Sequence, residues 1–363
     1  MNNMHIFLFV GTIDALMSII GYMYYRHYLP FGRTLTFGLI YLLMALGTAI
    51  SVILPQGTPH FLLKLTAWIE GLWIAFCYYT LLLAIIHLLC LLFSKLGGWQ
   101  LPSAKISIIG LAFICCFITW GSWRAFHPTV RTEALVTEKL PQNAHYKIVF
   151  LTDLHMGRIL GHDYAERLAA RINEQKPDLV VVSGDMLDER IFYVEEEDTL
   201  SALAQIKAPA YMAFGNHDYL DEPLRWQQML TDKGFYILRN TDTIIDNKIK
   251  ITGIDDYSKN RTNNQLINLS SQNEDYYSIL LDHQPRRMDA AAAAGYDLYL
   301  AGHTHTGQLF PNRLVTKKMY KLDYGRTNFG NLTAITNNGY GFWGPPVRTE
   351  IVPEMVVLEL RGK

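Results

Sequence analysis

The uneven distribution of charged residues is the feature that most constrains how this chain can fold. The 363 residues include 32 Lys and Arg and 33 Asp and Glu, and the net charge is −1. Only eight of these charged residues lie within the first 125 positions, whereas the rest of the chain has an ordinary charged content. This split predicts an apolar membrane region followed by a soluble domain. The near-neutral balance offers no field that would recruit a nucleic-acid polymer.

Four apolar runs divide the N-terminal region, and each approaches or exceeds the ~20 residues that a helix needs to cross a bilayer. Breaks containing Pro or Gly separate the runs, and aromatic residues near their ends are typical of membrane interfaces. We therefore expect a four-helix transmembrane region over residues 1–125; the alternative is a set of buried helices in a soluble protein. The runs are Ile6–Tyr25, Leu35–Leu54, Leu65–Phe93 and Ile106–Trp123.

Four crossings would place both termini on the same side of a plasma membrane or bacterial inner membrane. Basic residues in the short first and third loops lean slightly toward an extracytoplasmic position for the soluble domain. Asp14 and Glu70 lie within the runs, where ionisable groups are candidates for a function. The alternative for both is a structural role, either in a hydrogen bond between helices or, for Glu70, near the membrane interface.

Residues 126–144 are interpreted as a linker, and residues 145–363 as an α/β domain, because short β-rich runs alternate with helical patterns after residue 145. All four cysteines lie in the apolar region, so the soluble part holds no disulfide and no thiolate metal site. The predicted strands cover 146–152, 178–184, 210–215, 276–283 and 296–302, with a hairpin over 243–255; the predicted helices cover 163–175, 197–207, 221–233 and 285–295.

Five of these strands end in Asp, Asn or His, often beside glycine. Ligands in open α/β sheets bind beyond the carboxyl ends of the strands. His303 and His305 are two residues apart after the last strand, so in an extended segment both rings project to one side; the alternative is a polar turn facing water. The strand-end residues are Asp153, His155, Asp185, Asn216, His217, Asp218, His283, His303 and His305.

Seven of these residues form the candidate ligand set: Asp153, His155, Asp185, Asn216, His283, His303 and His305. Carboxylate, amide and imidazole ligands without cysteine suit manganese, iron or zinc, with manganese favoured. Seven ligands exceed the need of one ion and suit two divalent ions about 3.5–4 Å apart. Such a pair binds a phosphoryl group and makes water a better nucleophile. Hydrolysis by one metal ion is the alternative, although it leaves ligands unused.

The blocks "DLH", "GDMLD", "GNHD", "DH" and "GHTH" resemble, in order and spacing, those of the calcineurin-like metallophosphoesterases, over roughly residues 145–361. The apolar front end is similar to that of transmembrane proteins with a metallophosphoesterase domain, and the C-terminal tail to the branch that includes UDP-2,3-diacylglucosamine hydrolases. The resemblance implies two packed mixed β-sheets flanked by helices.

The resemblance also implies roles for the strand-end residues. Asp153, His155 and His305 would hold one metal; Asn216, His283 and His303 the other; and Asp185 would bridge them. His217 would be catalytic, acting on a phosphoryl or leaving oxygen, and Asp218 would orient it. Asp188 is expected to be structural.

The predicted activity is hydrolysis of a phosphodiester or pyrophosphate bond in a lipid-linked or nucleotide-lipid substrate. One alternative is a phosphatase for soluble nucleotides or phosphoproteins, and another is a transporter or sensor regulated by its phosphoesterase domain. Arg286 and Arg287 are candidates for pairing with a second phosphate, the alternative being a solvated helix start. Apolar residues after the last block could contact acyl chains or pack in the core: Leu309, Phe310, Tyr324, Phe329, Phe342 and Trp343.

Overall fold

The computed structural model describes the whole chain except residues 1–2, 55–56, 260 and 271–273. It divides into two compact units. A helical unit comprises residues 1–123 together with 344–349, and an α/β unit comprises residues 124–343 together with 350–363.

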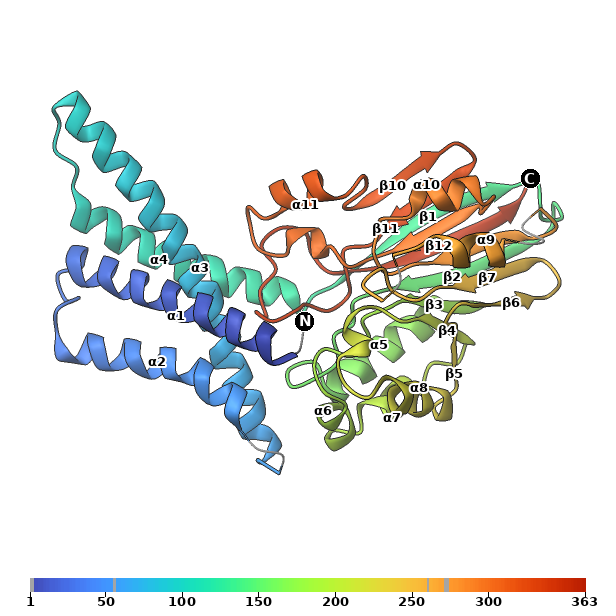
Figure 1. The fold of residues 1–363 in the computed structure, drawn as a ribbon, viewed down its shortest axis with the longest axis horizontal. Coiled ribbons are helices and arrows are strands. Elements are labelled where there is room, and N and C mark those ends of the chain that lie inside the picture. Colours follow the sequence, from blue (N-terminus) through green and yellow to red (C-terminus); the bar gives the residue numbers. More distant parts are fainter. Residues whose placement is uncertain (1–2, 55–56, 260, 271–273) are drawn as a thin grey trace. The chain divides into compact units, whose positions relative to one another are not determined.

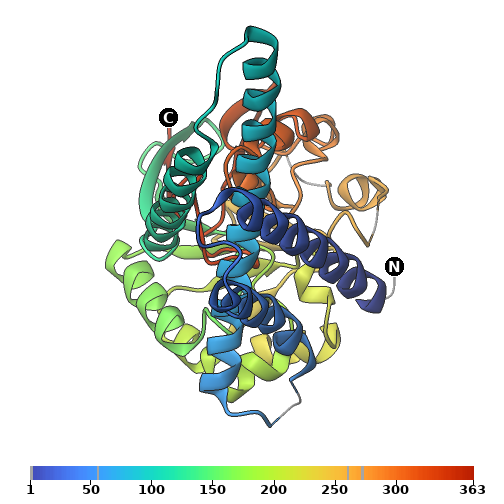
Figure 2. The same cartoon turned by 90° about the vertical axis from the view of Figure 1, so that its left-hand side faces the viewer.

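The helical unit contains four helices: α1 (Asn3–Tyr28), α2 (Leu35–Ile53), α3 (His60–Gly97) and α4 (Ser103–Ala125), of which the last two residues are counted with the α/β unit. They coincide with the four predicted apolar runs. Within the described residues, α3 and α4 are the helices long and apolar enough to cross a membrane, with mean hydropathies of 2.3 and 1.9. In Figure 2, α3 runs the length of the helical unit. A four-span region is therefore only partly supported.

Polar side chains inside the helical unit bond between helices. The hydroxyl of Tyr24 in α1 lies 2.9 Å from His87 Nδ1 in α3 and 3.0 Å from Ser107 Oγ in α4. Asp14 is also buried, with 6% of its surface exposed. The hydrogen bond of His87 is structural, because buried hydrogen bonds satisfy polar groups that water cannot reach.

Residues 344–349 pack with the helices rather than with the α/β unit from which the chain departs. The backbone N–H of Arg348 donates to the Gly121 carbonyl oxygen at 2.9 Å, and the hydroxyls of Tyr79 and Thr349 are 2.6 Å apart. The predicted boundaries treated residues 145–363 as one continuous domain. In the structure, six of these residues, 344–349, group with the helical unit.

The α/β unit is a sandwich of two mixed six-stranded sheets (Figure 1), as the resemblance implied. The first sheet has the order β1 (Thr129–Thr137), β12 (Glu354–Gly362), β2 (His145–Leu151), β3 (Leu179–Ser183), β4 (Ala210–Ala213), β5 (Phe235–Ile237). The second has the order β10 (Gly325–Phe329), β11 (Leu332–Thr336), β9 (Leu298–Ala301), β8 (Tyr277–Leu281), β7 (Ile249–Gly253), β6 (Thr241–Ile245).

Successive side chains of each strand point to opposite faces of its sheet, and this produces the layers of the sandwich. One set, including Ile148 and Val181 of the first sheet and Ile251 and Ile279 of the second, forms a shared core between the sheets. The opposite faces pack on helices, because buried strands in mixed sheets are apolar on both sides. Helices α5 (His162–Gln175), α6 (Ile191–Glu196), α7 (Thr199–Leu203) and α8 (Pro223–Asp232) cover the first sheet; α9 (Asn264–Leu269) and α10 (Met288–Ala293) cover the second.

The segment interpreted as a linker contains a strand. Residues 129–137 form β1, which pairs in parallel with β12 over its full length. Arg131 fixes this pairing, since its Nε and Nη2 atoms donate to the two carboxylate oxygens of Glu354 at 3.0 Å each. The local sequence did not predict this strand, because its partner strand lies more than 200 residues away in the chain.

Candidate metal centre

The first sheet delivers four strand-end residues to one edge of the sandwich. Asp153 and His155 follow β2, Asp185 follows β3, and Asn216 follows β4. These strands run in parallel. Their carboxyl ends therefore meet at the same edge, which brings together residues that are distant in the sequence.

The second sheet delivers the remaining ligand candidates in the same way. His283 follows β8, and His303 and His305 follow β9, which is parallel to β8. Nitrogens and carboxylate oxygens from the two sheets converge in clusters of three, each within 4.8 Å: Asp153, His155 and His305; Asp185, His283 and His303; and His155, Asp185 and His217.

The backbone at this edge adopts a conformation that side chains other than glycine seldom take. Five residues have left-handed φ angles: Asp153 (53°), His155 (47°), Asp185 (54°), His303 (71°) and His305 (45°). Such conformations cost free energy and cluster at functional sites, where the surrounding structure enforces them. The strand ends thus turn sharply to aim their side chains into the cluster.

Two of the flanking glycines are required by close approach. A Cβ atom on Gly215 would lie 2.1 Å from Asp185 Oδ1, and one on Gly302 would lie 2.3 Å from Asp153 Oδ2. Any larger residue at either position would displace a carboxylate of the candidate site.

His155 and His305 face each other across the first cluster, with their Nε2 atoms 3.0 Å apart. The Nδ1 atom of His155 lies 3.1 Å from a carboxylate oxygen of Asp188. Because that carboxylate accepts the Nδ1 proton, the Nε2 lone pair points into the cluster. This arrangement, in which a carboxylate orients a metal-binding histidine, is common at metal sites.

His283 is oriented by the same principle in the second cluster. Its Nδ1 atom donates to the Ser183 carbonyl oxygen at 2.7 Å, which leaves Nε2 as the ligand atom. That Nε2 lies 3.0 Å from Asp185 Oδ2 and 3.3 Å from His303 Nδ1.

Two of the candidate ligands hold a buried oxygen that has no hydrogen-bond partner among the described residues: Asp153 Oδ1 and Asn216 Oδ1. Asp153 Oδ1 faces three imidazoles, those of His305, His155 and His283, at 3.3, 3.8 and 3.9 Å. Leaving such groups unpaired is costly. A set of oxygens and imidazole nitrogens with converging lone pairs fits divalent cations.

The electrostatics of the clustered groups point the same way. Burial alone would lower the pKa of His283, but the adjacent Asp185 carboxylate raises that pKa well above its usual value. Burial, together with the His283 charge, lowers the pKa of His303 to about 4. Neighbouring imidazoles pushed in opposite directions are typical of a functional site.

Asp218 does not contact the His217 ring in the part of the chain that the structure describes, so the predicted orienting role is not observed. Its carboxylate is fully buried and accepts hydrogen bonds from backbone N–H groups and from the Trp226 Nε1–H. These bonds connect the turns that follow β3 and β4. The backbone donors are those of Gly215, Asp185, Met186 and Leu187. Burial and the Asp185 charge raise the pKa of Asp218 to about 6.

Asp188, which was expected to be structural, takes the orienting position. His217 Nδ1 donates to the Asp188 backbone carbonyl oxygen, and the Asp188 carboxylate binds His155 Nδ1. Since a carbonyl can only accept, the proton of a neutral His217 lies on Nδ1 and Nε2 remains free. The sequence feature that could have indicated this role is the second aspartate of "GDMLD", which is Asp188.

Comparison with known proteins decides the family. A family model described as calcineurin-like phosphoesterase matches residues 146–307. A metallophosphoesterase of Aquifex aeolicus is 30% identical over 244 residues, which cover 64% of this chain and 92% of that protein. This chain belongs to the calcineurin-like phosphoesterases. The resemblance predicted from the five blocks is therefore confirmed, and the protein is a metal-dependent hydrolase of phosphoester bonds.

Two other proteins named as metallophosphoesterases match a larger share of this chain. A metallophosphoesterase of Campylobacter jejuni is 29% identical over 265 residues, which cover 70% of each chain. A zebrafish protein named "Transmembrane protein with metallophosphoesterase domain" is 25% identical over 330 residues, which cover 84% of this chain and 74% of that protein.

The other residues that were predicted to contact the substrate differ in burial: some lie in the core and others at the surface. Arg287 is buried and its Nη1 donates to Asp282 at 2.9 Å, whereas Arg286 is exposed. Leu309 and Phe342 are buried, Tyr324 and Phe329 are half-buried, and Phe310 and Trp343 are about half exposed, at 54% and 55%.

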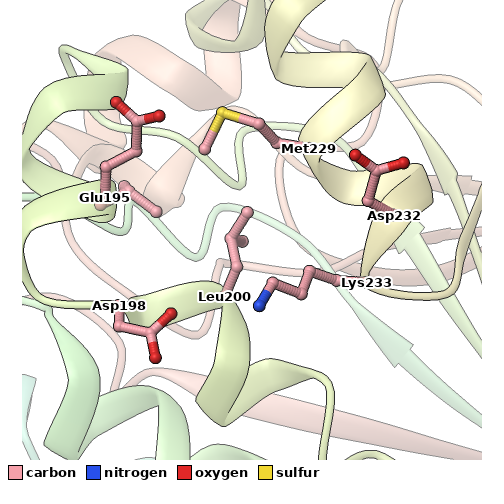
Figure 3. Close-up of a pocket in the computed structure, with 7 residues that line it drawn as sticks. Glu195, Asp198, Leu200, Met229, Asp232 and Lys233 are labelled. Atoms are coloured by element: carbon pink, nitrogen blue, oxygen red, sulfur yellow. The ribbon is translucent and has the colours of Figure 1, made fainter.

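A separate pocket lies among the outer helices α6, α7 and α8 and includes none of the predicted site residues (Figure 3). Its lining includes Lys233, whose Nζ donates to Ser201 Oγ at 2.6 Å, and the carboxylates of Glu195, Asp198 and Asp232. The converging donors of the strand ends, rather than this pocket, define the candidate metal centre.

Proposed function

We propose that this protein is a membrane-anchored dimetal phosphoesterase that hydrolyses a phosphodiester or pyrophosphate bond of an amphiphilic, lipid-linked substrate. The observation that carries the proposal is the convergence of six of the proposed ligands, together with His217, from five strand ends. In the proposed arrangement, Asp153, His155 and His305 hold one ion, Asn216, His283 and His303 hold the other, and Asp185 bridges them. Manganese is the preferred ion.

Bound divalent ions would supply Lewis acidity toward a phosphoryl oxygen and lower the pKa of water at the site. The chain's own residues do the rest. Asp185 is held in place by the His217 backbone N–H, which donates to its Oδ1 at 2.8 Å. Nε2 of His217 makes no hydrogen bond among the described residues. When the ring is protonated to the imidazolium, its Nε2–H is the candidate donor that would stabilise a phosphoryl oxygen or pass its proton to the leaving oxygen, which leaves the neutral ring with its proton on Nδ1.

An amphiphilic substrate is supported by an exposed aromatic side chain, that of Trp343, beside the candidate site. The Trp343 ring lies 6.1 Å from the His217 ring, between centroids, and Gln308 holds the Trp343 backbone through two hydrogen bonds. Two apolar helices of membrane-spanning length and the similarity to a protein named as transmembrane support the anchoring. Tethering beside a bilayer raises the local concentration of a lipid-linked substrate.

The test uses the full chain in lipid nanodiscs with added Mn²⁺. Bis-p-nitrophenyl phosphate, a nucleotide-diphospho-lipid and p-nitrophenyl phosphate are compared as substrates. We expect turnover of the two diesterified substrates, with the lipid preferred. Turnover of the monoester alone contradicts the proposal and favours a phosphatase.

A second test uses the variant Asp185→Asn, which replaces the proposed bridging carboxylate by an amide of equal size. We expect about 100-fold or greater loss of turnover, since removing a metal-site ligand weakens both binding and electrostatic stabilisation. Elemental analysis should find less than two bound ions per chain. Full turnover with two ions in this variant would refute the dimetal site.

A further inference from the structure

Next to the candidate metal centre, Arg286 presents an exposed guanidinium that is held in place by neutral groups. Its Nε donates to Gln284 Oε1 at 3.0 Å, and its Nη2 donates to the Tyr320 hydroxyl at 3.2 Å. Within the described residues no carboxylate forms an ion pair with it, and Nη1 makes no hydrogen bond. Its charge is therefore available to an anion from outside the chain.

Arg286 is also fixed in orientation by stacking. Its Cζ atom lies 4.6 Å from the ring centroid of Tyr320 and 5.5 Å from that of Tyr257. Cation–π contacts of this kind hold a planar guanidinium without neutralising it. Gln284 is itself anchored, because its Nε2 donates to both carboxylate oxygens of the buried Asp256 at 3.0 and 3.1 Å.

Tyr320 connects this guanidinium to the candidate metal centre. It is nearly buried, and its ring lies 6.1 Å from that of His303, between centroids. One aromatic ring thus separates the guanidinium from a proposed metal ligand. The neighbouring Arg287 is committed to Asp282 in the interior, so the two arginines have different roles.

We propose that Arg286, stacked on Tyr320 beside His303, binds a second phosphoryl group of the substrate. Arginine suits this task because its planar donors match phosphate oxygens in pairs. The inference rests on the proposed function, and it narrows the substrate to compounds in which a second phosphoryl group adjoins the one that is hydrolysed. Arg286 is then a specificity-determining residue.

The test measures inhibition of bis-p-nitrophenyl phosphate hydrolysis by the full chain. UDP-glucose, with two phosphoryl groups, is compared with uridine 5′-(methyl phosphate), which has one and carries the same nucleoside. We expect the wild-type protein to bind UDP-glucose at least about 10-fold more tightly, as an inhibition constant. Arg286→Ala should remove that preference. Arg286→Lys should retain part of it, because lysine keeps the positive charge but lacks the paired planar donors of a guanidinium.

The control is Arg361→Ala, which removes an exposed arginine near the end of β12. Because β12 runs antiparallel to β2, this position lies at the opposite end of the sheet from the candidate site. We expect this variant to keep the wild-type preference. The inference is overturned if the wild-type protein shows no preference, or if Arg286→Ala retains it. Absence of any bis-p-nitrophenyl phosphate hydrolysis by the wild-type protein would instead refute the proposed function.

Discussion

At the scale of single residues, three histidines of the candidate site are oriented by the oxygen atoms that their Nδ1 atoms contact. The Asp188 carboxylate and the Ser183 carbonyl orient His155 and His283, so that each Nε2 points into the cluster. His217 bonds to the Asp188 carbonyl at the rim, where 13% of its side chain is exposed. All three acceptors enforce the same tautomer, with the proton on Nδ1. Position separates the candidate ligands from the candidate acid, because His155 and His283 are buried in the cluster and His217 lies at its rim.

Replacing His217 by glutamine should therefore leave the proposed metal ligands intact while removing the proton donor. We expect turnover to fall by about 10²–10⁴-fold, the usual range for loss of general acid–base catalysis. Elemental analysis should still find two ions per chain, and the melting temperature should be unchanged. Loss of one ion in this variant would make His217 a ligand instead.

Asp218, in contrast, is placed to stabilise the turns beneath the site. Its carboxylate accepts several buried backbone N–H groups, so Asp218→Ala would leave those donors without a partner. Unpaired buried groups cost about 1–3 kcal/mol each. We expect a clear drop in the free energy of unfolding, measured by urea denaturation, in addition to any loss of activity. A variant with wild-type stability would contradict this role.

At the scale of secondary-structure elements, the site depends on parallel strands ending at one edge. Periodicity and turn residues predicted most of these strands and the helices between them, because those signals are local. The sequence predicted a linker at β1, because the residues of this strand are recognisable as a strand only when they are paired with β12. The buried carboxylate of Glu354, with 3% of its side chain exposed, is paired with Arg131 across this junction.

Arg131→Ala should thus test whether β1 is integral to the sheet. Removing one partner of a largely buried ion pair costs about 3 kcal/mol, because the remaining charge loses its compensation. Arg131→Lys, which keeps a charge but not the two-point contact, should lose less. Unfolding free energies of the full chain equal to wild type for both variants would show that β1 behaves as a linker.

At the scale of the whole molecule, residues 344–349 join the two units by a second covalent path. The chain leaves the α/β unit after Trp343, packs with α3 and α4, and returns at Glu350. Arg348 is fully buried within the helical unit. The α/β unit is therefore not a segment that can be removed cleanly from the chain.

Deleting residues 1–123 should expose this segment. We expect the excised protein to melt at a lower temperature than the full chain in nanodiscs, and to aggregate, because apolar surface that packed on α3 and α4 becomes exposed. A matched deletion that also replaces residues 344–349 by a Gly/Ser linker should reduce aggregation. Equal solubility of the two truncated proteins would argue against this packing.

The sequence by itself determined the α/β alternation, the apolar N-terminal runs and the identity of the strand-end residues, because each depends on neighbours within a few positions. Tertiary structure decided which residues orient them: Asp188 rather than Asp218 contacts His217, and Arg286 rather than Arg287 remains exposed. It also decided that β1 pairs with β12 and that residues 344–349 pack with the helices. These contacts join residues far apart in the chain, and local periodicity carries no information about such partners.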